Sequence, residues 1–307
     1  MQLSPSNLHV IRPTSRRSFI TTTLGCAASL CVPAISAPVP IQFGSQLYGW
    51  GQYYQREGKN FNSHLGEIFS ALHDMGYDYA ETSLDIAKPE TNVKQAELLI
   101  LKGLKPVSLY SGGTFHETSK AGKAVEQIIA AATHCAKAGF KIINCNPDAI
   151  GRNKTAEELG TQARALQTLG EGLETLGLKL GIHHHTPELA NEAKEFHSNF
   201  QNTPGSKVGF CYDVHWVFRG GIKPEAALKD YGSRIVSWHL RQSRRGIWWE
   251  DMDTGDIDYG AIARYAKNQL LSPNYTVELA LEEGTKLTRN AVDNHRKSLE
   301  FVRAIFG

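Results

Sequence analysis

The chain has 307 residues, of which 41% are hydrophobic and 21% are charged, a composition typical of a globular protein with one large domain or two modest ones. Its formal net charge of +2 is nearly neutral. The sequence has no basic stripe long enough for a nucleic-acid groove, so we exclude nucleic acid as a partner.

The first 37 residues have the order of an export signal. Arg16-Arg17 is followed by a mildly apolar stretch and then by small residues, and the run Ser-Arg-Arg-Ser-Phe-Ile resembles a twin-arginine signal. The stretch is too short and too rich in Thr, Ser and Pro for a membrane-spanning helix. We therefore predict a signal peptide at residues 1–37 and a single periplasmic domain at residues 38–307, without stable membrane association.

From residue 38 onward, short apolar runs alternate with longer helical patterns. The candidate strands are 40–48, 77–83, 105–111, 141–147, 178–185, 207–213, 234–241 and 275–281. The candidate helices are 61–75, 91–103, 117–138, 155–176, 187–201, 224–231, 258–271 and 288–305. Eight strands alternating with eight helices over about 270 residues predict an α/β fold of the (β/α)8 TIM barrel type, whose typical length is about 250 residues. A doubly wound open sheet is the alternative, but no Gly-rich phosphate turn follows the first strand.

Alternation within the last two strands separates the barrel interior from the side that packs on helices. In the seventh strand, Val236 and Trp238 share the face expected to pack on the outer helices, and Ser237 and His239 share the other. In the eighth strand, Glu278 lies on the face of small and polar residues. The last residues of such a face lie near the C-terminal mouth, where TIM barrels have their active sites.

Four residues expected to face the interior are polar and lie at or near the ends of consecutive strands: His183, Asp213, His239 and Glu278. They follow one another at intervals of about 30 residues, the length of one βα unit. Their polar groups must all be satisfied in a narrow space, which is difficult without a shared ligand. Two histidines and two carboxylates suit one divalent ion, such as Mn, Co, Fe, Mg or Zn.

Several segments resemble the xylose isomerase-like TIM barrels known as sugar phosphate isomerases/epimerases. These segments are LKLGIHHHTPE (178–188), the stretch from KVGFCYDVHW to RIVSWHLRQS (207–243), DTGDIDYGAIARYAK (253–267) and YTVELAL (275–281). The resemblance implies metal binding by Asp213, His239 and Glu278, with His183 in the place of the first ligand. The sequence departs from the family pattern in two places. Many members have Glu at the position of His183, and Arg241-Gln242 stands where a Lys-Asp pair is common after the histidine of the seventh strand.

The three consecutive histidines divide by strand alternation. His183 is predicted to be a ligand with a catalytic role. His185, on the same side, is predicted to contact the substrate or act as acid or base, and His184 to face away as a structural residue. The sequence leaves two interpretations of Glu188 open: it orients His185, or it is an acid in the first turn of the next helix, where negative charge is favoured.

Further residues near the predicted mouth are candidates for substrate contact: Glu81, His116, His215, Trp216 and Arg241. Glu81, at the end of the second strand, either contacts substrate or belongs to a buried ion pair. Trp216 can stack on a sugar, although aromatic side chains are more common in cores. We expect only one of Asn144 and Asn146 to lie at the mouth.

These residues favour an isomerase or epimerase acting on a sugar or keto-sugar. The metal would polarise a carbonyl, and Glu278 or His185 would remove the neighbouring proton to give an enediolate. A keto-glycoside lyase or dehydratase would use the same chemistry. A metal-dependent phosphodiesterase of the abasic-site endonuclease type is disfavoured by the neutral charge, and a non-catalytic sugar-binding barrel also fits the sequence. Export disfavours a phosphorylated substrate, and a homo-oligomer is compatible with the sequence.

The export signal gives a first testable prediction. The exported protein should lack residues 1–37, and replacing Arg16 and Arg17 by Lys should keep the precursor inside the cell, because the arginine pair is part of the signal. N-terminal sequencing of exported parent and variant measures both outcomes. An exported chain that still begins at Met1 would contradict the prediction.

Overall fold

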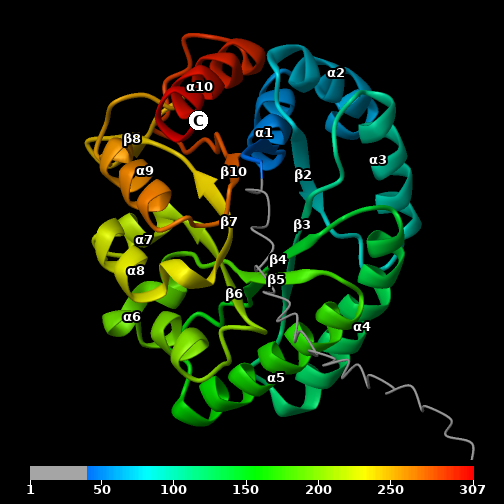
Figure 1. Cartoon of the computed structure of the whole chain (residues 1–307), viewed down its shortest axis with the longest axis vertical. Helices are drawn as coiled ribbons and strands as arrows, with labels where there is room; N and C mark the ends of the chain where they lie inside the picture. The colour runs from blue at the N-terminus through cyan, green and yellow to red at the C-terminus, as the bar shows by residue number, and fades with distance from the viewer. Residues whose placement is uncertain (1–39) are drawn as a thin grey trace, which may run out of the picture. The chain divides into compact units, whose positions relative to one another are not determined.

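The computed structural model describes residues 40–307, so the predicted signal peptide lies outside the described residues. Eight parallel strands close into a barrel in the order β1-β10-β7-β6-β5-β4-β3-β2, and helices surround them (Figure 1). This closure confirms the predicted (β/α)8 TIM barrel. It excludes the doubly wound alternative, because that fold has an open sheet.

The elements follow the predicted alternation. The barrel strands are β1 (Gln42–Gln46), β2 (Tyr79–Ser83), β3 (Ser108–Gly113), β4 (Ile142–Pro147), β5 (Lys179–Ile182), β6 (Gly209–Asp213), β7 (Ile235–Leu240) and β10 (Asn274–Val277). The helices are α1 (Tyr48–Arg56), α2 (Leu65–Met75), α3 (Glu90–Leu101), α4 (Thr118–Lys137), α5 (Ala156–Thr175), α6 (Thr186–Gln201), α7 (Val214–Arg219), α8 (Pro224–Tyr231), α9 (Tyr259–Asn268) and α10 (Ala291–Phe306). The 3-10 turns η1 (Phe61–His64) and η2 (Gly232–Arg234) and the hairpin of β8 (Ser243–Arg244) and β9 (Ile247–Trp248) complete the fold. Helices α1 and α7 and this hairpin are additions to the predicted elements.

Side-chain caps fix where the helices begin. At α5, the Thr155 hydroxyl accepts a hydrogen bond from the Glu158 backbone N–H at 3.2 Å, and the Glu158 carboxylate accepts one from the Thr155 N–H at 2.7 Å. Asp258 caps α9 in a similar way, through a 3.0 Å hydrogen bond from the Ala261 N–H. Because each helix follows a strand, its capped end lies at the C-terminal mouth of the barrel, where loops can carry a site.

The main hydrophobic core lies between the barrel and the helices. Trp238 of β7 packs against Tyr275 of β10 and Phe306 of α10, with ring centroids 5.4 and 6.2 Å away. This packing confirms the predicted outer face of Trp238 and leaves the inner face for polar side chains. Helix α10, red in Figure 1, lies beside α2 and so completes the ring of helices. No helix within residues 40–307 has both the length and the apolar character needed to cross a membrane.

The predicted orientation of Val236 is wrong. The register between β6 and β7 shifts between Phe210 and Cys211, which leaves Val236 without a partner in the ladder. Val236 packs in a small cluster with residues such as Tyr79 and Ile142, separate from the main core. A bulge inserts one residue and changes the face that it takes, so strict alternation fails at this position.

Candidate active site

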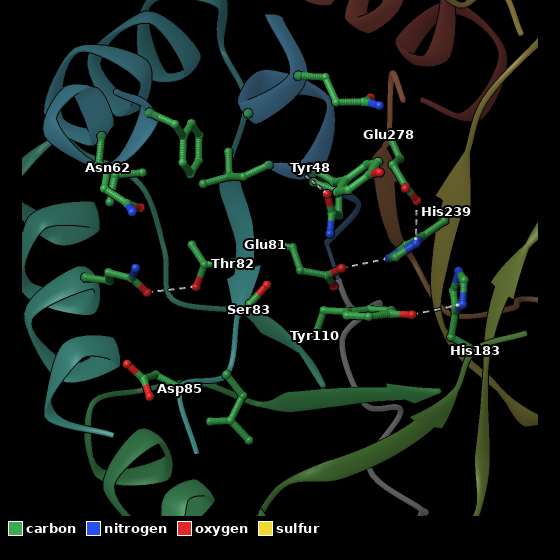
Figure 2. Close-up of a pocket in the computed structure, with 18 of the residues that line it drawn as sticks. Tyr48, Asn62, Glu81, Thr82, Ser83, Asp85, Tyr110, His183, His239 and Glu278 are labelled. Carbon is green, nitrogen blue, oxygen red and sulfur yellow. Dashed lines mark hydrogen bonds and ion pairs between the residues drawn. The ribbon is translucent and has the colours of Figure 1, made fainter. Parts of the chain in front are cut away.

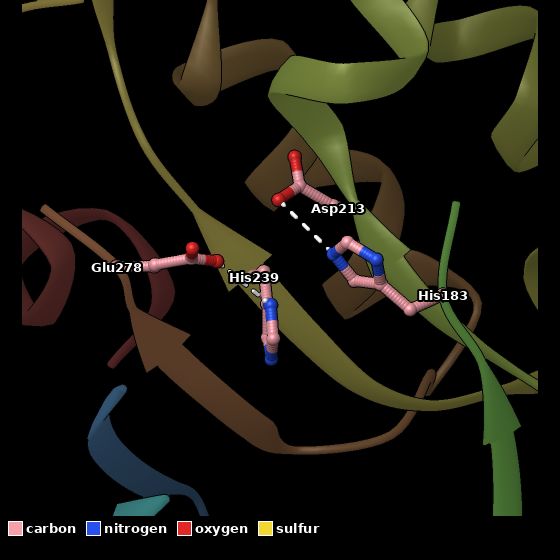
Figure 3. Close-up of side chains that lie close together, drawn as sticks. All are labelled: His183, Asp213, His239 and Glu278. Carbon is pink, nitrogen blue, oxygen red and sulfur yellow. Dashed lines mark ion pairs between the residues drawn. The ribbon is translucent and has the colours of Figure 1, made fainter. Parts of the chain in front are cut away.

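The four residues predicted to share a ligand lie together at the C-terminal ends of neighbouring strands (Figure 3). His183 follows β5, Asp213 ends β6, His239 lies in β7 and Glu278 follows β10. One possible ligand atom from each lies within 4.8 Å of the others, and all four residues are buried. Within residues 40–307, no other group of three or more His, Cys, Asp or Glu is arranged in this way.

His183, Asp213, His239 and Glu278 are together named the ligand group. Their donor atoms fit a divalent ion. His183 Nε2 is 3.4 Å from Asp213 Oδ2, and His239 Nδ1 is 2.9 Å from Glu278 Oε2. Both of these buried nitrogens lack a hydrogen bond of good geometry among the described residues. A buried polar atom without a partner costs about 1–3 kcal/mol, and a shared cation would remove that cost for these two histidine nitrogens. Nitrogen and carboxylate ligands of this kind suit zinc and other divalent metals.

Each histidine of the ligand group is oriented by its second ring nitrogen. His183 Nδ1 is 3.2 Å from Asn146 Oδ1, so Nδ1 carries the proton and Nε2 is left to accept or bind. The same Nδ1 atom of His183 is also 3.5 Å from the Tyr110 hydroxyl. His239 Nε2 is 2.8 Å from Glu81 Oε1, an ion-pair contact without good hydrogen-bond geometry that leaves Nδ1 on the side of the group (Figure 2). The buried ion-pair interpretation of Glu81 is therefore the one that its contacts support.

Glu81 is itself held by the barrel interior. Its Oε2 accepts a 2.7 Å hydrogen bond from Asn144 Nδ2, and Asn144 Oδ1 accepts one of 2.8 Å from the Ser237 hydroxyl. The prediction that only one of Asn144 and Asn146 faces inward is wrong, because the Asn146 side chain also reaches the interior at His183. Residues two apart on a strand share a face, so both belong there.

Arg241 balances the two carboxylates of the ligand group. Its Nη2 is 2.8 Å from Asp213 Oδ2 and 3.6 Å from Glu278 Oε2, and its side chain is buried. Its guanidinium carbon lies 4.2 Å from the ring centroid of Trp248. Burial raises the pKa of each carboxyl, but Arg241 and the neighbouring histidines together outweigh burial. The pKa of Asp213 is held well below its usual range, and the pKa of Glu278 falls to about 2.

His185 lies beside the ligand group without belonging to it. Its ring centroid is 4.7 Å from that of His183 and 5.1 Å from that of Trp216. Burial, reinforced by His183, lowers the pKa of His185 to about 3, so the imidazole is neutral near pH 7. The carboxylate of Glu188 accepts a 2.6 Å hydrogen bond from the backbone N–H of His185. Glu188 therefore caps α6 and fixes the backbone of His185.

His184 takes the predicted opposite direction. Its ring packs against Phe196 and Phe200, with centroid separations of 4.8 and 5.4 Å, and its Nε2 is 3.1 Å from Asn199 Nδ2. These contacts lie on the helix-facing side of the barrel. His184 is therefore a buried structural residue.

A large cavity of about 1610 Å³ opens above the ligand group. It is lined by these predicted site residues: Glu81, His183, His185, Trp216, His239, Arg241 and Glu278. Asp213 lies behind them, and His215 is buried next to Trp248, outside the lining. The loop after β3 carries His116 to a separate cavity of about 380 Å³ between α4 and α5, so the structure does not bring His116 to this site. Tyr110, which also lines the large cavity, was not predicted although it lies on a predicted strand.

Comparison with known proteins gives a family and a set of similar folds. The family model of the xylose isomerase-like TIM barrel matches residues 69–305. A sugar phosphate isomerase/epimerase from Parabacteroides distasonis aligns with a TM-score of 0.69 and 19% identity over 88% of this chain and 96% of its own. D-allulose 3-epimerase from Methylomonas sp., in complex with D-allulose, aligns with a TM-score of 0.68 and 14% identity over 87% of this chain and 98% of its own. 3-keto-D-glucoside 4-epimerase from E. coli aligns with a TM-score of 0.64 and 16% identity over 86% of this chain and 100% of its own. No curated protein sequence matches the chain.

The buried carboxyl of Glu188 should make stability depend on pH. Burial raises its pKa to about 7 in the folded protein, from an ordinary value of 4.5. Between these values the unfolded chain has lost a proton that the folded protein retains. Stability should therefore fall as the pH rises through this range, by about 1–3 kcal/mol.

The variant Glu188→Gln keeps an acceptor for the His185 N–H but removes the titration. Its free energy of unfolding, measured in urea with a chelator present, should change less between pH 5 and pH 7 than that of the parent. Glu192→Gln is the control, because Glu192 is exposed and lies in the non-helical kink within α6, close to Glu188 in the sequence. An equal pH dependence in the parent and Glu188→Gln would contradict the prediction.

Proposed function

Because this chain belongs to the xylose isomerase-like TIM barrel family, we propose that it is a divalent-metal-dependent isomerase or epimerase of a sugar or keto-sugar. The observation that carries the proposal is the ligand group of His183, Asp213, His239 and Glu278 on the floor of a cavity that His185 also lines. The solved structures with the same fold include epimerases of sugars, which supports this substrate class.

In the proposed reaction the ligand group holds one divalent ion: Mn, Co, Fe, Mg or Zn. When bound, such an ion polarises a sugar carbonyl and acidifies the adjacent C–H. Asn146 and Glu81 hold the rings of His183 and His239 in the orientation that this binding requires. The described residues contain one group of four ligands, which suits a single ion better than the metal cluster of the phosphodiesterase alternative.

His185 is the side chain best placed to move the proton. Its ring lines the cavity beside the ligand group without belonging to that group. Glu278, the other candidate, already contacts His239 and Arg241. The pKa values of about 3 for His185 and about 2 for Glu278 keep both unprotonated at neutral pH. Both are weak bases at these values, so close positioning must supply much of the rate.

Arg241 supplies positive charge next to the reacting carbon. It remains cationic because Asp213 and Glu278 offset the cost of its burial, and it lines the cavity. The proposed enediolate carries negative charge on its oxygens, and a fixed guanidinium in a site of low dielectric stabilises that charge. A lyase or dehydratase that expels a substituent from the same enediolate is the second candidate, which product analysis distinguishes from an epimerase.

A neutral sugar is the proposed substrate. Two cationic residues line the cavity, Arg241 and Lys94, and Arg241 is committed to the carboxylates of the ligand group. Phosphate recognition usually uses an arginine fork or a helix N-terminus. The predicted export of the protein agrees with this part of the proposal, because sugar phosphates are mainly cytoplasmic compounds.

Metal binding is tested by removing one ligand. His239→Ala should lower the content of divalent metal strongly, because a lost ligand leaves an open and weaker site. Glu81→Gln should weaken metal affinity by about 10–100-fold, the usual effect of changing a group that orients a ligand. Elemental analysis after reconstitution with Mn²⁺ measures both. His116→Ala is the control, since His116 lies outside the cavity; metal content equal to that of the parent in His239→Ala would show that His239 is not a ligand.

Proton transfer is tested by solvent exchange. The protein is incubated in deuterium oxide with D-fructose, D-allulose or a methyl 3-keto-glucoside, and deuterium should enter the carbon next to the carbonyl. His185→Asn should lower turnover by about 10²-fold or more at unchanged metal content, the usual scale for a positioned acid–base group. Glu278→Gln is the companion variant, and it should lower metal content as well as turnover.

The same experiment can reject the mechanism. Direct internal transfer of the proton could hide solvent exchange, so substrate deuterated at that carbon is followed in parallel. If the label stays at its original carbon through complete turnover, no enediolate forms. A larger loss of turnover in Glu278→Gln than in His185→Asn, at matched metal content, would move the role of base to Glu278.

A further inference from the structure

The cavity extends well beyond the ligand group. Its volume of about 1610 Å³ exceeds the range of about 300–1,000 Å³ that is common for small-molecule pockets. The end away from the ligand group is named the outer arm and is formed by α1, η1, the loop after β2, and α3. Its lining side chains include Gln55, Asn62, Asp85, Lys94 and Gln95, and Tyr48 lies at its inner end, beside Glu278 (Figure 2). Figure 2 shows Asn62 and Asp85 on the helix side of the cavity, opposite His183 and His239.

Gln95 is a fixed hydrogen-bonding group in the outer arm. Its Oε1 accepts hydrogen bonds from the Thr82 hydroxyl and from Asn92 Nδ2, each at 3.0 Å. Asn92 is fully buried and also donates to the backbone carbonyl of Ser83, so this arrangement is anchored to the end of β2. The Nε2 group of Gln95 has no partner among the described residues. A donor held in place in this way costs little conformational entropy when a ligand binds.

Tyr48 places an exposed aromatic ring at the inner end of the outer arm, next to the ligand group (Figure 2). It is 59% exposed, although it begins α1 and its backbone N–H is held by the side chain of Gln46. An aromatic ring combines apolar faces with a polar hydroxyl. The apolar C–H face of a sugar can pack on such a ring while its hydroxyls bind neighbouring amides such as Gln55 and Gln95.

The charges of the outer arm balance. Lys94 and Asp85 are its charged members with opposite sign, and the other residues named above are neutral. An anionic group such as a phosphate would find one lysine opposed by a carboxylate. Neutral amides and hydroxyls instead match the many donors and acceptors of an uncharged sugar.

We infer that the outer arm binds a second sugar unit, so that the substrate is a keto-sugar within a disaccharide or other glycoside rather than a free monosaccharide. The inference rests on the proposed function, because it places the reacting sugar at the ligand group. The outer arm then selects substrates by size, and its amides give the second unit its hydrogen bonds.

Binding is tested with glycosides that have no free carbonyl and therefore cannot be enolised. Calorimetry on the full chain loaded with Mn²⁺ compares methyl β-cellobioside with methyl β-glucoside, and methyl α-maltoside with methyl α-glucoside. At least one disaccharide should bind about tenfold more tightly than its monosaccharide, the effect of one or two added hydrogen bonds. If neither disaccharide binds more tightly, the inference is overturned.

Substitutions locate the gain in the outer arm. Gln95→Ala and Tyr48→Ala should each remove most of the advantage of the disaccharide. Glu97→Ala is the matched control on α3, because Glu97 is exposed and does not line the cavity. If Gln95→Ala and Tyr48→Ala weaken the monosaccharide and the disaccharide equally, the second unit does not lie in the outer arm and the inference fails.

Turnover separates this inference from the proposed function. The ketose disaccharides palatinose and lactulose are compared with D-fructose by kcat/KM and by solvent deuterium exchange. Deuterium exchange with D-fructose, together with a kcat/KM for both disaccharides no higher than for D-fructose, would support the proposed function and overturn the inference about the outer arm. The opposite result is that disaccharides bind more tightly, Gln95→Ala removes this advantage, and no sugar exchanges deuterium with solvent. That result would support the second sugar site in the outer arm and overturn the proposed function.

Discussion

Burying two carboxylates in one small space is unfavourable unless positive charge stands beside them. Asp213 and Glu278 meet this constraint at the mouth of the barrel, where Arg241 contacts both of them and His239 contacts Glu278. Arg241 is in turn packed on Trp248 of the β8–β9 hairpin. The hairpin therefore has a structural connection to the ligand group, although it contributes no ligand of its own. A divalent ion would complete the same balance of charge.

The barrel divides the proposed work between its strands and its helices. The ligand group and its orienting partners come from strand ends, where the backbone is held on both sides by the parallel ladder. Rigid strands suit chemistry, because catalytic geometry tolerates little displacement. The outer arm comes from α1, η1 and α3, which are more exposed. Under the proposed function, a change at Asn62 or Gln95 would alter the accepted substrate size without moving a member of the ligand group.

Strand alternation predicted the ligand group because its four members each lie at or near the end of a strand in a closed parallel sheet. The same rule failed at Val236, where a bulge breaks the register between β6 and β7. It was misapplied to Asn144 and Asn146, which share a face. His116 does not line the site cavity, because the loop after β3 carries it to the start of α4, and the sequence does not show the path of that loop.

The outer arm was not predictable from the sequence. Gln55, Asn62 and Gln95 are ordinary polar residues on helical segments, and only the fold brings α1, η1 and α3 to one cavity. The role of Glu188 was likewise open, because an acid in a first helical turn can cap the backbone or orient a neighbour. The contact with the His185 N–H decides between these interpretations.

The central claim is that two histidines and two carboxylates hold one divalent ion where the sugar reacts. Pulsed electron paramagnetic resonance on the protein loaded with one equivalent of Mn²⁺ tests it most directly, because the nitrogen nuclei of bound imidazoles modulate the signal. We expect coupling to two histidine nitrogens in the parent and to one in His183→Ala. A spectrum without nitrogen coupling, or one that His183→Ala and His239→Ala leave unchanged, would contradict the claim.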